Sequence, residues 1–147
     1  MRDHDRLAVL GLLLGSASKI IDEVHASVAA SGAADLRPTH GFAFARISAG
    51  EATVSDVAEH LGVTKQAASV LVAELVDGGY VRRTPHPTDA RAQVLALTDR
   101  GWACTVVANE TMLAVVRRWE RTVGAAEATT AVHALAALAA GGRLRPI

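Results

Sequence analysis

The sequence predicts a mainly α-helical protein with one small β-hairpin of two or three strands. Hydrophobic residues make up 50% of the 147 residues but aromatic residues only 3%, so the core must consist of Ala, Val and Leu. Such a core favours close-packed helices over a sheet sandwich. Apolar residues recur at helical spacing near both ends of the chain, whereas turn and strand signals gather between about residues 53 and 97.

The N-terminal segment has the pattern of a long amphipathic helix that ends at Ser31-Gly32. Its apolar positions alternate spacings of three and four: Leu7, Leu10, Leu14, Ala17, Ile21, Val24 and Val28. Further apolar side chains widen this stripe, so we expect the helix to pack on two sides, one of them against a partner chain. The run from Leu7 to Gly15 is similar to a signal-peptide core, but the flanking acids cancel the basic residues and the helical pattern continues beyond it. Lys19 and the short apolar run also argue against a membrane span, so we expect a cytoplasmic protein with no membrane partner.

Residues typical of helix N- and C-termini place the remaining helices. Pro38 suits the first turn of a short helix that ends at Ser48-Ala49-Gly50, and Thr98 caps a long helix that runs to about Arg121. An Ala-rich helix follows Gly124 and ends at Gly141-Gly142. We therefore expect dimerisation helices in residues 1–34 and 122–147, a compact module in residues 35–100 and a linking helix in residues 98–121.

Residues 53–77 have the pattern of a helix-turn-helix. Thr53 to Asp56 forms a capping box, Gly62 supplies the left-handed turn, and Thr64 caps the second helix. The candidate DNA contacts at the start of that helix are Thr64, Lys65, Gln66, Ala67, Ser69 and Val70. Lys can bind guanine, Gln can pair with adenine, and Ala or Val can meet a thymine methyl group. The alternative is an ordinary solvated helix face.

A β-hairpin with a Pro-rich tip follows, with strands expected at 80–83 and 92–97. A basic hairpin after a recognition helix is typical of a wing, which makes the whole module a winged helix-turn-helix. Its candidate DNA-binding residues are Arg82, Arg83, His86, Asp89 and Arg91. Arg91 suits a phosphate or a narrow minor groove. We expect Asp89 to orient Arg91, Arg82 or Arg83 through a charge-assisted hydrogen bond.

Residues 54–101 closely resemble the MarR family of transcriptional regulators. Asp89-Ala90-Arg91 matches that family's D-x-R pattern, Leu97-Thr98 and Gly101 match its L-T-x-x-G pattern, and Pro87 also agrees. The resemblance implies a homodimer formed by the terminal helices, with one recognition helix per protomer in the major groove of a pseudo-palindromic operator, about 34 Å apart. It also implies a repressor that responds to a small-molecule effector. Ala90, Val70 and Arg37 depart from the family's usual residues.

The charge balance is unusual for a DNA-binding protein. The chain has 15 basic and 15 acidic residues, and the segment from Glu51 to Arg91 has four basic and six acidic ones. The acids would have to point away from phosphate. We expect modest affinity and a salt dependence no steeper than about six phosphate contacts would give.

Other kinds of site are less well supported by the sequence. A candidate effector pocket consists of His40, Phe42, Phe44 and Trp102, with plain core packing as the alternative. Cys104 is either a redox sensor or a buried structural thiol. No histidine or cysteine spacing suits a metal and no set of residues suits catalysis, so we expect no cofactor and no enzymatic activity. A winged helix that binds protein instead of DNA is the rival function.

Overall fold

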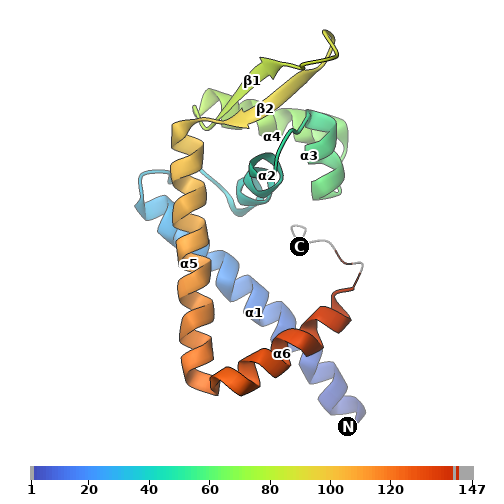
Figure 1. The fold of residues 1–147 in the computed structure, drawn as a ribbon, viewed down its shortest axis with the longest axis vertical. Helices are drawn as coiled ribbons and strands as arrows, with labels where there is room; N and C mark the ends of the chain where they lie inside the picture. The colour runs from blue at the N-terminus through green and yellow to red at the C-terminus, as the bar shows by residue number, and fades with distance from the viewer. Residues whose placement is uncertain (1, 141, 143–147) are drawn as a thin grey trace.

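A computed structural model describes residues 2–140 and 142, and it contains six helices and two strands among them. In chain order these are α1 (Asp3–Ala30), α2 (Pro38–Ser48), α3 (Val54–Leu61), α4 (Lys65–Asp77), β1 (Val81–Pro85), β2 (Gln93–Leu97), α5 (Asp99–Val123) and α6 (Ala125–Leu138) (Figure 1). The predicted fold class is confirmed: a mainly helical chain with a helix-turn-helix and one hairpin.

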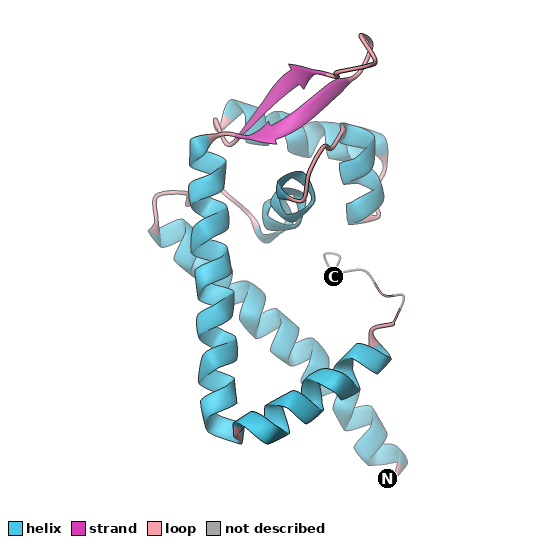
Figure 2. Ribbon diagram, in the orientation of Figure 1, coloured by secondary structure: helices cyan, strands magenta, loops and turns pink. Residues whose placement is uncertain are grey.

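The two long helices and α6 form what we call the helical arm. α1 packs against α5, which it crosses obliquely, and α6 lies at the far end of α5 from the hairpin (Figures 1 and 2). Arg118 on α5 holds Glu23 on α1 with nitrogen–oxygen distances of 2.8 and 3.0 Å. None of the helices in the described part of the chain is long and apolar enough to cross a membrane.

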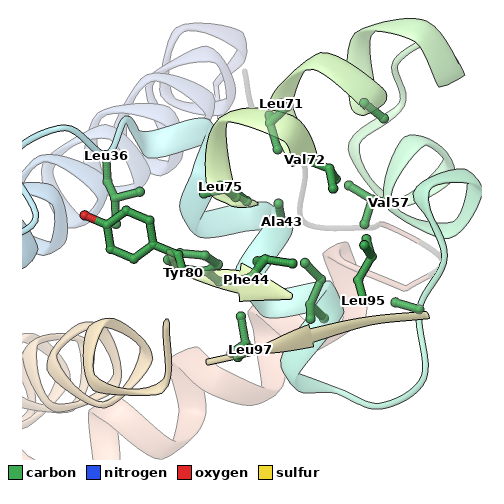
Figure 3. Close-up of a cluster of buried hydrophobic side chains, with 14 of the residues drawn as sticks. Leu36, Ala43, Phe44, Val57, Leu71, Val72, Leu75, Tyr80, Leu95 and Leu97 are labelled. Carbon is green, nitrogen blue, oxygen red and sulfur yellow. The ribbon is translucent and has the colours of Figure 1, made fainter. Parts of the chain in front are cut away.

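Residues 38–97, from α2 to β2, form what we call the compact unit. Its interior is a continuous cluster of small aliphatic side chains around Phe44 and Tyr80 (Figure 3). Tyr80, Leu75, Val57 and Val72 are the largest side chains that are fully buried. The core is thus made mainly of Ala, Val and Leu, as the composition predicts.

The predicted caps and turns of the helix-turn-helix are present. The Thr53 hydroxyl accepts the Asp56 N–H while the Asp56 carboxylate accepts the Thr53 N–H, which completes the capping box of α3. Gly62 ends α3 with φ +69°, in the left-handed region that favours glycine. The Thr64 hydroxyl then accepts the Ala67 N–H at 3.1 Å and begins α4.

The hairpin differs in detail from the prediction. β1 begins at Val81 instead of Tyr80, and β2 begins at Gln93 instead of Ala92. Tyr80 is drawn inward: its backbone N–H closes the end of α4 on the Leu75 carbonyl and its ring enters the core. The third strand is reduced to one bridge, in which the Leu95 N–H donates to the Ala52 carbonyl at 2.7 Å.

The ends of the last two helices also shift. α5 extends to Val123, two residues beyond the expected Arg121, before Gly124 breaks it with φ +97°. α6 stops at Leu138, short of the expected Gly141-Gly142. Gly141 lies outside the described residues.

Candidate nucleic-acid interface

The N-terminal half of α4 presents the side chains predicted to read DNA. Lys65, Gln66, Ala67 and Val70 are exposed, and Ser69 is half-buried. Ala68, Leu71, Val72 and Leu75 turn inward and fix the helix on the core. The Thr64 hydroxyl oxygen caps the helix, so Thr64 has a structural task as well as its candidate DNA contact.

The hairpin lies at the same end of the molecule as α4, opposite α6 (Figure 1). Arg82, Arg83 and Arg91 are exposed on it. Arg83 makes only a long 3.5 Å contact with the Gln93 side chain. The recognition-helix candidates and the wing arginines therefore belong to one end of the fold.

Several acids of this segment have internal partners, which bears on the charge balance. Glu74 is engaged by Arg37 and His40, Asp56 by Thr53 and Arg46, and Glu51 by His86. By contrast, no ion pair forms within the described residues for the four cations of the segment, which are Lys65, Arg82, Arg83 and Arg91. Two of these acids, Glu74 and Asp56, thus lie beside an arginine from outside the segment, so the simple count of charges overstates how acidic this part of the compact unit is.

The predicted role of Asp89 needs a correction. Asp89 makes no contact with an arginine side chain among the described residues; its carboxylate accepts the backbone N–H of Arg91 at 3.0 Å. A carboxylate two residues before an N–H reaches it easily across a tight turn. The D-x-R pattern therefore shapes the backbone at Arg91 and leaves its guanidinium free.

His86 lies inside the hairpin tip instead of projecting from it. Its side chain is 21% exposed, and its Nε2 lies 2.9 Å from the Glu51 carboxylate. Its Nδ1 accepts the backbone N–H groups of Thr88 and Asp89. The sequence did not indicate Glu51 as a partner, because the contact joins residues 35 positions apart.

A second cluster, also missed from the sequence, joins α2 to the recognition helix. The His40 Nδ1 accepts the Arg37 N–H at 2.9 Å, so histidine takes the place of the Glu or Gln of a capping box at the start of α2. Its Nε2 lies 3.0 Å from Glu74 on α4, and the Arg37 guanidinium donates to the same carboxylate oxygen. A departure from the family's usual residues, Arg37, is thus tied to an acid on the recognition helix.

Tyr80 is the centre of a third cluster, at the border between the compact unit and the arm. Its hydroxyl donates to Asp35 at 2.5 Å, and the Arg100 guanidinium lies 4.1 Å from the ring centroid. Burial, and next the hydrogen bond to Asp35, raises the pKa of Tyr80 to about 12. The same hydrogen bond lowers the pKa of Asp35.

The L-T-x-x-G pattern has a physical reason at this border. The Thr98 hydroxyl donates to the Gly79 carbonyl and accepts the Gly101 N–H, so it caps α5 and fastens it to the turn after α4. A Cβ on Gly101 would lie 2.2 Å from the Tyr80 carbonyl oxygen. Only glycine permits this close approach of α5 to Tyr80.

The four residues of the candidate effector pocket do not share one environment. His40 and Phe44 are core residues, which is the alternative the sequence left open, and Phe42 packs partly against the same core. Trp102 is 47% exposed on α5. A separate groove of about 400 Å³ lies between α1 and α5 and includes Glu23, Val107, Thr111 and Arg118 in its lining.

Cys104 is a buried thiol on α5. Burial raises its pKa, which lowers the fraction of reactive thiolate at neutral pH. The structural interpretation of this cysteine therefore fits better than a redox sensor.

Comparisons with a family model and with solved structures agree with the fold described above. A model of the MarR family matches residues 34–92. No curated protein sequence matches the chain. Among solved structures, RV1404 from Mycobacterium tuberculosis is 25% identical with a TM-score of 0.77, and the match covers 92% of each chain.

Two further structures share the fold. Wild-type MarR from E. coli is 21% identical over 88% of this chain and 96% of its own, with a TM-score of 0.66. The transcriptional repressor CouR, solved on a 23-mer DNA duplex, is 22% identical over 95% of this chain and 98% of its own, with a TM-score of 0.67. CouR from Rhodococcus jostii RHA1 has also been solved with p-coumaroyl-CoA. The chain is therefore similar to MarR-family regulators in sequence over residues 34–92 and in fold over most of its length.

Proposed function

We propose that this chain is a sequence-specific DNA-binding transcriptional regulator, a repressor that binds a pseudo-palindromic duplex as a homodimer. The observation that carries the proposal is the division of charge at the hairpin end of the compact unit. Lys65, Arg82, Arg83 and Arg91 form no ion pair among the residues that the structure describes, whereas Glu51, Asp56 and Glu74 are held by internal partners. Free cations beside an exposed helix N-terminus suit a duplex with its regular phosphates.

The homodimer is supported by the apolar surface of the helical arm. Leu7, Leu10 and Leu14 on α1 are exposed, as are Val116 and Trp119 on α5. An exposed apolar surface of this extent is typical of an association site. A second copy would place two recognition helices on one duplex, and a regulator of this kind would act in the cytoplasm.

The test is DNA binding by wild type, Arg91→Ala and the matched control Arg117→Ala. Arg117 is an exposed arginine on α5 with no ion pair among the described residues, away from the hairpin. Duplex from upstream of the chain's own gene and duplexes selected from a random pool serve as targets. We expect a specific gel shift that Arg91→Ala weakens and Arg117→Ala leaves unchanged, with the salt slope falling by about 1.8 for Arg91→Ala, about 0.9 for each chain of the dimer.

The absence of any shift at low salt, for a chain that is folded, would contradict the proposal and favour a winged helix that binds protein. Equal losses of DNA affinity for Arg91→Ala and Arg117→Ala would show that binding depends on overall charge and not on an interface at the hairpin. A wild-type salt slope steeper than about six phosphate contacts would give would contradict the modest salt dependence that the sequence predicts.

A small-molecule effector is a further part of the proposal, supported by the complex of CouR with p-coumaroyl-CoA. The groove between α1 and α5 offers about 400 Å³ next to the two long helices of the arm. A ligand there would act by changing how the two compact units are spaced. Release of the bound duplex by aromatic acids or their CoA esters, scored by fluorescence anisotropy, is the expected result; no release by any of them would contradict this part alone.

A further inference from the structure

The tip of the hairpin holds a continuous chain of polar contacts from Glu51 to Arg91. Glu51 contacts His86, the imidazole of His86 accepts the Asp89 N–H at 3.1 Å, and the Asp89 carboxylate accepts the Arg91 N–H at 3.0 Å. The Ala92 N–H donates to the Asp89 carbonyl at 3.0 Å and closes the turn. Each link fixes the backbone of the next residue.

The contacts of the imidazole define its protonation state. Nδ1 accepts two backbone N–H groups, from Thr88 at 3.2 Å and from Asp89, so this nitrogen carries no proton. Nε2 lies 2.9 Å from the Glu51 carboxylate and must therefore be the nitrogen that donates. A neutral imidazole has one donor and one acceptor, and both are used here.

The position of Glu51 gives this chain of contacts a firm base. Glu51 precedes Ala52, whose carbonyl accepts the Leu95 N–H at 2.7 Å, and Ala52 is fully buried. Pro85 and Pro87 flank His86 and restrict the backbone on both sides. His86 thus joins the hairpin tip to the α2–α3 connection, which belongs to the core of the compact unit.

We propose that His86, as the neutral Nε2–H tautomer, is a positioning residue that fastens the wing tip to Glu51 and holds Arg91 in place for DNA. The part of this inference in which Arg91 contacts DNA rests on the proposed function; the fastening of His86 to Glu51 does not. It replaces the expectation that His86 itself contacts DNA, because both ring nitrogens are already engaged within the protein. The side chain that contacts DNA is then Arg91, at the other end of the chain of contacts.

The first test is a double-mutant cycle on DNA affinity with His86→Ala, Arg91→Ala and the double variant. His86→Ala should weaken binding by about 3- to 10-fold, as expected when the DNA contact that Arg91 makes is weakened. If His86 acts through Arg91, the double variant binds no more weakly than Arg91→Ala alone. Losses that multiply would show an independent DNA contact by His86 and would overturn the proposal.

Two conservative variants separate the two ends of the imidazole. The amide oxygen that His86→Asn introduces can accept the backbone N–H groups in place of Nδ1 but does not extend as far as Nε2, so this variant should lose the contact with Glu51 and bind about as weakly as His86→Ala. His86→Gln can reach Glu51 but leaves those N–H groups without an acceptor, so it should resemble His86→Ala. Wild-type affinity for either variant would show that one end of the imidazole is enough and would contradict the fastening.

The second test needs no DNA. Nitrogen-15 NMR of the histidine rings in the free protein should show His86 with a proton on Nε2 and none on Nδ1. The opposite tautomer, or a mixture of both, would overturn the fastening. If wild type binds no duplex, the DNA step fails together with the proposed function, while the NMR result still decides whether His86 fastens the hairpin.

Discussion

The compact unit and the helical arm differ in how completely each buries its own apolar residues. In the compact unit, Leu75, Val57, Val72 and Tyr80 are fully buried, and only Val63 and Val70 remain as large exposed hydrophobic side chains. In the arm, fifteen large hydrophobic side chains are exposed on α1, α5 and α6 in the described residues. The compact unit therefore buries its own apolar residues within one chain, whereas the arm leaves a large apolar surface exposed, the surface that we propose a second copy covers.

The polar contacts also differ: those of the compact unit join several of its elements to one another, as its apolar core does. Ion pairs and caps in the compact unit join separate elements, such as Glu74 on α4 with Arg37 and His40 at the start of α2. In the arm, the cross-helix pair that the structure shows is Arg118 with Glu23. The comparison teaches that contacts within one chain fix the geometry of the compact unit, while in the proposed dimer the spacing of two such units would depend on association.

The largest expected effect comes from the core of the compact unit. Leu75→Ala should lower the free energy of unfolding by about 2–5 kcal/mol, because it leaves a cavity in a fully packed site. Leu10→Ala on the exposed face of α1 should instead lower stability by an amount that depends on chain concentration, because it weakens an association step. Urea unfolding at several chain concentrations makes the comparison. Equal, concentration-independent losses would remove the distinction between the two regions.

A second effect concerns the border between the two regions. Tyr80 is the only tyrosine of the chain, so the ultraviolet absorbance of tyrosinate reports on it alone. Its pKa is raised to about 12 from 10.0 in the folded state. The neutral hydroxyl therefore stabilises the fold fully below about pH 10, and this stabilisation is lost as the pH rises toward 12.

The measurement is an alkaline titration of wild type and Asp35→Asn. We expect wild type to titrate near 12, and the variant to titrate lower because the Asp35 charge no longer opposes ionisation. A tyrosine pKa near 10 in a chain that is still folded would mean that the Tyr80 hydroxyl is not buried against Asp35 at the border between arm and compact unit.

The smallest expected effect compares how much one carboxylate in each region, Asp56 in the compact unit and Glu23 in the arm, contributes to stability in acid. The backbone N–H and hydroxyl of Thr53 lower the pKa of Asp56, and the Arg118 guanidinium lowers that of Glu23. Both acids stabilise the fold above their unfolded pKa values, and this contribution is lost as the pH falls through the lowered values, below about pH 4. Asp56→Asn should flatten the acid end of the stability curve more than Glu23→Gln, since exposed ion pairs contribute little. Acid unfolding followed by circular dichroism measures both variants. A larger change in acid stability for Glu23→Gln than for Asp56→Asn would contradict this expectation.

The sequence predicts the local features of this molecule better than its long-range contacts. The Thr53 capping box, the Gly62 turn and the Thr64 cap could be predicted because each is specified within four residues. Tyr80 looked like a strand residue, since nothing near it indicates that its hydroxyl meets Asp35, 45 positions away. His86 looked like a surface contact for the same reason, because Glu51 is not adjacent in sequence.

The candidate site shows the same limit. The exposed side chains of α4 and the wing arginines could be placed from periodicity and turn chemistry alone. The charge count could not show that Glu74 faces Arg37, or that the Asp89 carboxylate binds a backbone N–H instead of an arginine side chain. Partner choice among several charges depends on tertiary packing, which the local pattern does not specify.

The mass of the chain in solution tests most directly the claim that the arm is completed by a second copy. Light scattering on wild type and Leu10→Glu, at matched concentrations, is the measurement. We predict twice the chain mass of 15.3 kDa for wild type, and a shift toward one chain for the variant while the compact unit stays folded. A wild-type mass of 15.3 kDa at every concentration would contradict the account, because the exposed face of the arm would then need another explanation.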